Sequence, residues 1–71
     1  MRIVNEPAGG DTWICLQVPE RPDTAAGTVL VECNSGAERV ELVMGPDWED
    51  ISEEAMITAI HAGVARNKGR P

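Results

Sequence analysis

Carboxylates crowd the segment between Gly45 and Glu54, where the chain reads Gly-Pro-Asp-Trp-Glu-Asp-Ile-Ser-Glu-Glu. Oxygen-rich clusters of this kind bind Ca²⁺ or Mg²⁺ when their side chains surround the ion. An EF-hand loop counted from Asp47 would need a bidentate glutamate at its twelfth position, where this chain has Thr58. The spacing therefore predicts no metal site, and the acids are better explained as the cap of a helix that follows them.

Trp48 stands in the middle of these acids and is one of only 2 tryptophans in the chain. The ring can serve as a lid on a small core, because large apolar side chains are scarce here. It can also be an exposed aromatic anchor, which together with charged neighbours gives protein interfaces affinity and steering. The second interpretation defines a candidate partner-binding cluster: Asp47, Trp48, Glu49 and Asp50.

Catalysis would have to involve His61, the only histidine. A Cys-His nucleophilic pair needs Cys15 or Cys33 within hydrogen-bond reach of the imidazole, and strand alternation places Cys33 on the helix-facing side. No third orienting group accompanies that pair, so we expect no enzyme activity and no cofactor. The cysteines form no Cys-x-x-Cys motif and are typical of buried thiols.

Composition limits the classes of function further. The chain has 71 residues and a net charge of −6, which fits one small domain over residues 1–71 with a frayed basic tail at 66–71. An acidic body repels the phosphate backbone, so direct nucleic-acid binding is not expected. No apolar run approaches the roughly 20 residues of a membrane span, and Met1 to Gly10 lack a signal-peptide core, which together predict a cytoplasmic protein.

Apolar alternation predicts three or four strands, at residues 2–5, 12–18, 28–33 and 38–44. In the second of them Ile14 and Leu16 belong to a fully aliphatic set, and we expect this set to face the core. The turn after Cys33 predicts a hairpin in which Cys33 lies opposite Glu38. That register pairs the aliphatic residues on one face and places an ion pair on the other: Val31 with Val40, Val29 with Leu42, and Glu32 with Arg39.

Helix signals begin at Ser52, a good N-cap that is followed by Glu53 and Glu54. The buried stripe is formed by residues at helical spacing: Met56, Ile57, Ile60 and Val64. Gly63 beside this stripe indicates a close approach of the helix to the sheet. Ile51 can act as a hydrophobic staple, and Asn67 or Gly69 can end the helix.

These elements predict a two-layer α+β domain, an antiparallel meander of three or four strands covered on one face by a single C-terminal helix. The uncovered face then carries a candidate self-association surface: Trp13, Leu30 and Val43. We expect a small acidic protein-interaction module that forms a homodimer, or that binds a basic protein and inhibits it by mimicking its ligands. The alternative is a small-molecule or metal-binding accessory domain or enzyme subunit.

Overall fold

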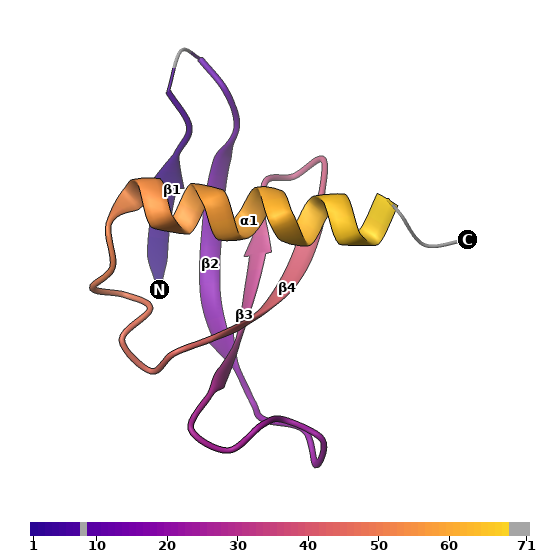
Figure 1. The fold of residues 1–71 in the computed structure, drawn as a ribbon. Coiled ribbons are helices and arrows are strands. Elements are labelled where there is room, and N and C mark those ends of the chain that lie inside the picture. Colours follow the sequence, from indigo (N-terminus) through magenta and orange to yellow (C-terminus); the bar gives the residue numbers. More distant parts are fainter. Residues whose placement is uncertain (8, 69–71) are drawn as a thin grey trace.

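The computed structural model describes residues 1–7 and 9–68. Its elements follow the chain as β1 (Arg2–Asn5), β2 (Thr12–Val18), β3 (Val29–Asn34), β4 (Arg39–Met44) and α1 (Glu53–Lys68). The strands form one 4-stranded sheet in the order β1-β2-β3-β4, and each pairs antiparallel with its neighbour. Helix α1 runs across the strands on one face of this sheet (Figure 1). The predicted two-layer α+β meander is confirmed.

Helix α1 begins where its cap residue predicts. The Ser52 hydroxyl accepts a hydrogen bond from the Ala55 N–H at 3.1 Å, which satisfies one of the free donors of the first turn. Glu53 and Glu54 occupy that turn, where carboxylates oppose the positive end of the helix dipole. The predicted basic tail starts inside the helix, because residues 66–68 belong to α1; residues 69–71 lie outside the described part of the chain.

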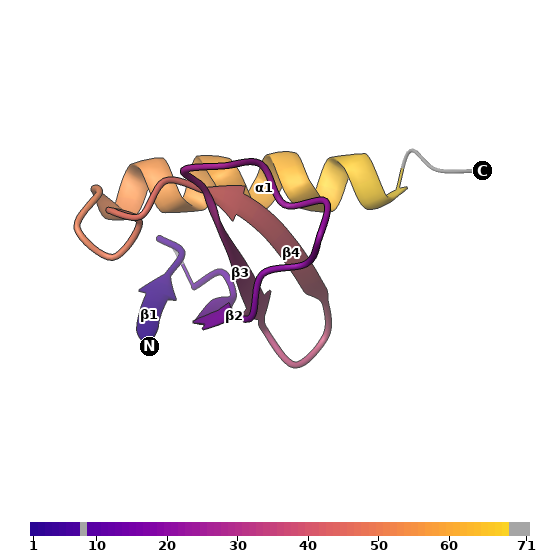
Figure 2. The ribbon, with the colours of Figure 1, turned by 90° about the horizontal axis from the view of Figure 1, so that it is seen from below.

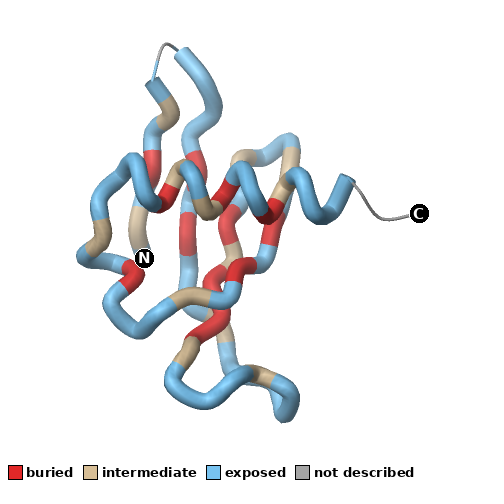
Figure 3. Tube along the Cα trace, in the orientation of Figure 1, coloured by how far each residue is buried: buried red, intermediate tan, exposed pale blue. Residues whose placement is uncertain are grey.

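The core lies between α1 and the sheet face beneath it, as the buried segments in Figure 3 show. Tryptophan rings, two thiols and branched aliphatic side chains fill it, since the chain has no Phe or Tyr. Its buried members come from every strand, from the turn before the helix and from α1: Val4, Trp13, Cys15, Val29, Val31, Cys33, Val40, Leu42, Trp48, Met56 and Ile60.

Gly63 brings α1 into close contact with β4. A Cβ atom built on this glycine would lie 2.6 Å from Cγ2 of Val40 and 2.7 Å from Cδ2 of Leu42. Any larger residue would therefore push the helix away from the strand or displace core side chains. The close approach that the sequence predicts at Gly63 is confirmed.

The prediction for the faces of β2 is wrong. Trp13 and Cys15 point to the core with 2% and 0% exposure, whereas Ile14 and Leu16 are each 45% exposed on the opposite face. Alternation alone gives two sets and does not say which is inside. The indole ring of Trp13 fills the core better than an aliphatic side chain, because it buries more apolar surface.

The β3–β4 register also differs from the expected one. Cys33 pairs with Val40, and Asn34 with Arg39, so the hairpin is shifted by two residues. The shift preserves the faces, and Val29, Val31, Val40 and Leu42 still point inward. It replaces the expected Glu32 to Arg39 ion pair by a cross-strand pair of carboxylates, Glu32 and Glu41. The turn takes in Ser35 to Glu38, where Ser35 N–H bonds the Glu38 carbonyl at 3.0 Å and Gly36 has a φ of 89°.

Candidate functional site

Trp48 is a lid on the core. Its ring is 1% exposed, and the indole Nε1–H donates a hydrogen bond to Oε1 of Gln17 at 3.1 Å. Its backbone carbonyl accepts a hydrogen bond from Nη1 of Arg2 at 2.9 Å. The ring therefore belongs to the interior of the fold and offers no exposed aromatic anchor to a partner.

The acids around Trp48 remain on the surface as part of a compact turn. The Trp48 N–H bonds the Gly45 carbonyl at 3.1 Å, and the Asp50 N–H bonds the Asp47 carbonyl at 2.8 Å. The carboxylate of Glu49 forms an ion pair with the N-terminal amino group of Met1, whose nitrogen lies 3.4 Å from Oε2. Within residues 1–7 and 9–68, no three His, Cys, Asp or Glu side chains are arranged to hold a metal ion. The turn thus positions the start of α1.

His61 takes part in a surface contact. Its Nε2 atom meets Oε1 of Glu6, whose Oε2 accepts the Asp11 N–H at 3.0 Å. The hydrogen bond from His61 is the main reason that the pKa of Glu6 lies below its ordinary value. The imidazole, which is 61% exposed, is therefore paired with a carboxylate from the β1–β2 connection. Cys33 lies buried beneath the helix, and no Cys-His pair forms.

The broad face of the sheet that α1 leaves uncovered is the most distinctive surface of the described chain (Figure 2). We call it the outer face. Four large aliphatic side chains project from it with substantial exposure: Ile3 at 52%, Ile14 at 45%, Leu16 at 45% and Val43 at 60%. Ile3 and Ile14 are direct cross-strand partners, and Leu16 follows Ile14 on the same side of β2, so these three form one apolar ridge.

A shallow hollow lies beside the apolar ridge, between β2 and β3. Ile14 and Leu16 form one of its walls, and the polar side chains of Glu32 and Asn34 form the other. Its remaining lining comes from Thr12 and the turn at Ser35 and Gly36. The outer face therefore combines the projecting apolar ridge with the adjacent hollow. A surface of complementary shape could pack against both.

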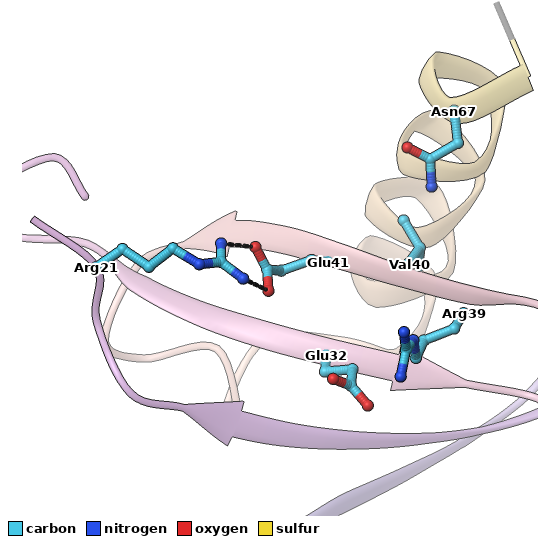
Figure 4. Close-up of a pocket in the computed structure, with 6 residues that line it drawn as sticks. All are labelled: Arg21, Glu32, Arg39, Val40, Glu41 and Asn67. Carbon is cyan, nitrogen blue, oxygen red and sulfur yellow. Dashed lines mark hydrogen bonds and ion pairs between the residues drawn. The ribbon is translucent and has the colours of Figure 1, made fainter. Parts of the chain in front are cut away.

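Charges on the outer face balance one another. Arg21, in the β2–β3 connection, holds Glu41 through both guanidinium nitrogens, with Nη2 and Oε2 2.7 Å apart (Figure 4). This bidentate hydrogen bond is the main cause of the lowered pKa of Glu41. Glu32 and Arg39 lie beside the pair on β3 and β4 (Figure 4). Two carboxylates and two guanidinium groups thus give this part of the surface a net charge near zero, whereas the net charge of the whole chain is −6.

Of the three residues predicted to form the self-association surface, Leu30 and Val43 are direct cross-strand partners on the outer face, and Trp13 lies on the opposite face. Trp13 is in the core, so its predicted place on the outer face is wrong. Leu30 is on the outer face but only 4% exposed, because residues 21 and 23–25 of the β2–β3 connection border it. Val43 is exposed there as expected. Sequence reasoning missed Ile3, Ile14 and Leu16, whose exposure would have followed from placing the larger Trp13 ring inside.

We find no match to this chain among protein-family models, curated proteins or solved structures. Within the described residues, the one helix is too short and too polar to cross a bilayer. Any functional conclusion must therefore come from the geometry of the molecule.

Proposed function

We propose that this protein is a small homotypic interaction module, in which two copies associate through their outer faces. The observation that carries the proposal is the apolar ridge of Ile3, Ile14 and Leu16, uncovered on a chain of 71 residues. Two such sheets can stack face to face about 10 Å apart, as in a β-sandwich. Each ridge would then pack into the hollow between β2 and β3 of the other copy.

The charge distribution supports a second copy as the occupant. A chain with a net charge of −6 repels another copy of itself wherever its acids dominate the surface. The outer face is locally balanced because Arg21 neutralises Glu41 and because Arg39 and Glu32 line the same pocket. A two-fold axis through this face can bring Glu32 of one copy toward Arg39 of the other, so the same surface is complementary to itself.

The area of the outer face indicates a weak dimer. Four strands about 4.8 Å apart and about six residues long give a face of roughly 20 by 20 Å. Two such footprints bury roughly 800 Å² in total, which is below the about 1,200–2,000 Å² of stable specific interfaces and within the range of weak, transient contacts. We therefore expect a weak dimer that is populated only at high protein concentration, with an affinity set by the fit of the apolar ridge more than by area.

Sedimentation across a range of protein concentrations tests the proposal, with Ile14→Glu as the decisive variant. The wild-type protein should change from monomer to dimer as concentration rises, while Ile14→Glu should remain monomeric with an unchanged circular dichroism spectrum. Ala62→Glu is the matched control, because it adds the same charge at an exposed position of α1 and should dimerise normally. A wild-type protein that stays monomeric at every concentration would contradict the proposal.

Salt distinguishes this arrangement from binding to a basic protein through the exposed carboxylates of Asp47, Glu49 and Asp50. Added salt screens the repulsion between two acidic bodies as well as the attraction between Glu32 and Arg39 of the two copies, so these opposing effects should leave the affinity of the homodimer nearly unchanged. A complex with a basic protein would weaken as salt rises. Dimers that dissociate in salt would therefore argue against the outer face as the contact.

A further inference from the structure

Cys15 and Cys33 occupy directly opposite positions on β2 and β3. Both side chains are 0% exposed, and both point into the core beneath α1. Each thiol is among the groups that influence the pKa of the other, as expected for neighbouring side chains on one face of the sheet. Directly opposed residues of antiparallel strands have Cα atoms about 4.5–5.5 Å apart, which falls within the separation of about 4.4–6.8 Å found in disulfides.

We propose that Cys15 and Cys33 form a reversible cross-strand disulfide when the protein meets an organic disulfide such as oxidised glutathione. One cysteine thiolate attacks a sulfur of the oxidant, and a mixed disulfide forms while one oxidant thiol departs. The second cysteine thiolate then attacks the cysteine sulfur of that mixed disulfide and displaces the other oxidant thiol. The two cysteines lose two protons and two electrons, and the oxidant is reduced to two thiols.

The position of the pair makes its reactivity depend on the helix. Burial raises the pKa of both thiols, so little thiolate is present while α1 covers them. An oxidant the size of glutathione disulfide also has no path to a sulfur that is fully enclosed. Thiol–disulfide exchange therefore proceeds from molecules in which α1 has opened locally. When α1 closes again, it protects the dithiol or the disulfide that is present at that moment.

The disulfide would link the two strands on either side of the β2–β3 connection. It closes a loop through residues 16–32, which includes the segment that holds Arg21 over Glu41. Closing a loop of this length restricts the unfolded chain and should lower the equilibrium constant for unfolding about a hundredfold. The oxidised protein would then open at α1 without separating β2 from β3.

Equilibration of the full chain in glutathione redox buffers, started from both the reduced and the oxidised protein, tests the proposal. After acid quenching and alkylation, intact mass should show a species that has lost two hydrogens, carries no glutathione and is not alkylated. Reduction should restore the dithiol. The chain contains only these 2 cysteines, so the assignment is unambiguous.

Cys15→Ser and Cys33→Ser serve as controls, and each should accumulate only the mixed disulfide with glutathione. When the reduced and the oxidised protein reach the same final ratio of disulfide to dithiol, that ratio does not depend on how slowly α1 opens. The proposal is overturned if the two starting points converge on the dithiol, on stable glutathione adducts or on disulfides between chains.

Discussion

The indole N–H of Trp48 reaches across 3.1 Å to the side-chain oxygen of Gln17, joining the turn before α1 to the far end of β2. The same tryptophan is bound to β1 through the Arg2 guanidinium at its carbonyl. A single residue outside the regular elements therefore connects two strands to the start of the helix.

Replacing Gln17 with Leu should test that connection. The substitution leaves the indole N–H without its acceptor, and we expect a loss of about 1 kcal/mol in the free energy of unfolding. Gln17→Glu is the matched control, because it keeps an oxygen at the same position and should cost less. Urea unfolding followed by tryptophan fluorescence measures both. Equal losses in the two variants would show that the hydrogen bond does not stabilise the fold.

Gly63→Ala should destabilise the protein although alanine favours helices. The gain of about 1 kcal/mol in helix propensity is outweighed by overpacking against Val40 and Leu42, which costs about 1–3 kcal/mol. Val40→Ala in the same chain should remove part of the added cost, since it vacates the space on the Val40 side of the new methyl group and leaves the contact with Leu42. Thermal unfolding of the two single variants and the double variant checks this. A more stable Gly63→Ala protein would contradict the close contact.

Ser52→Ala should weaken the start of α1. The N–H of Ala55 then loses its hydroxyl acceptor, and we expect a loss of about 1 kcal/mol in the free energy of unfolding. Ser52→Asp keeps an acceptor and adds a favourable charge at the helix N-terminus, so it should retain wild-type stability. Denaturant unfolding compares the two variants with the wild-type protein. Identical unfolding midpoints for Ser52→Ala and Ser52→Asp would show that the side chain at position 52 does not cap the helix.

The pair of Arg21 and Glu41 should make stability depend on acidity. The pKa of Glu41 in the folded state lies below its ordinary value of 4.5, so the carboxylate stabilises the fold above that pH. This contribution is lost as the pH falls from about the unfolded value through the folded one. Arg21→Gln should raise the pKa of Glu41 toward 4.5 and flatten the acid limb of the stability profile.

Carboxyl chemical shifts read by NMR across an acid titration follow Glu41 directly. Arg39→Gln is the control, because the charge of Arg39 is the weakest of the influences on this group. It should shift the Glu41 titration less than Arg21→Gln does. Equal shifts in the two variants would mean that the bidentate contact does not dominate.

Local chemistry predicted much of this fold from the sequence. The cap at Ser52 and the buried helical stripe each depend on residues within a few positions of one another, and the glycine at position 63 indicated a tertiary contact because glycine is costly inside a helix. The inward face of the β3–β4 hairpin was also predictable, because in both strands one set is wholly apolar whereas the other contains charged residues. These rules hold because neighbouring side chains decide them.

The faces of β2 could not be decided in this way. Ile14 and Leu16 are as apolar as Trp13 and Cys15, so the choice depends on which set fits beneath α1 and beside β1. The hairpin register depends on the turn geometry around Gly36, and a shift of two residues leaves every face unchanged. The composition of the outer face follows from these choices, so the wrong side for Trp13 also gave the wrong residues for that face.

The order β1-β2-β3-β4 has a consequence for how quickly the chain reaches its native state. Each strand pairs with its sequence neighbour, so the sheet can grow by successive hairpins that close short loops. Contact between α1 and β1 joins opposite ends of the sequence and is the slowest closure to find by diffusion. We therefore expect the four strands to pair rapidly. The packing of α1 and Trp48 against the sheet should be the rate-limiting step of folding.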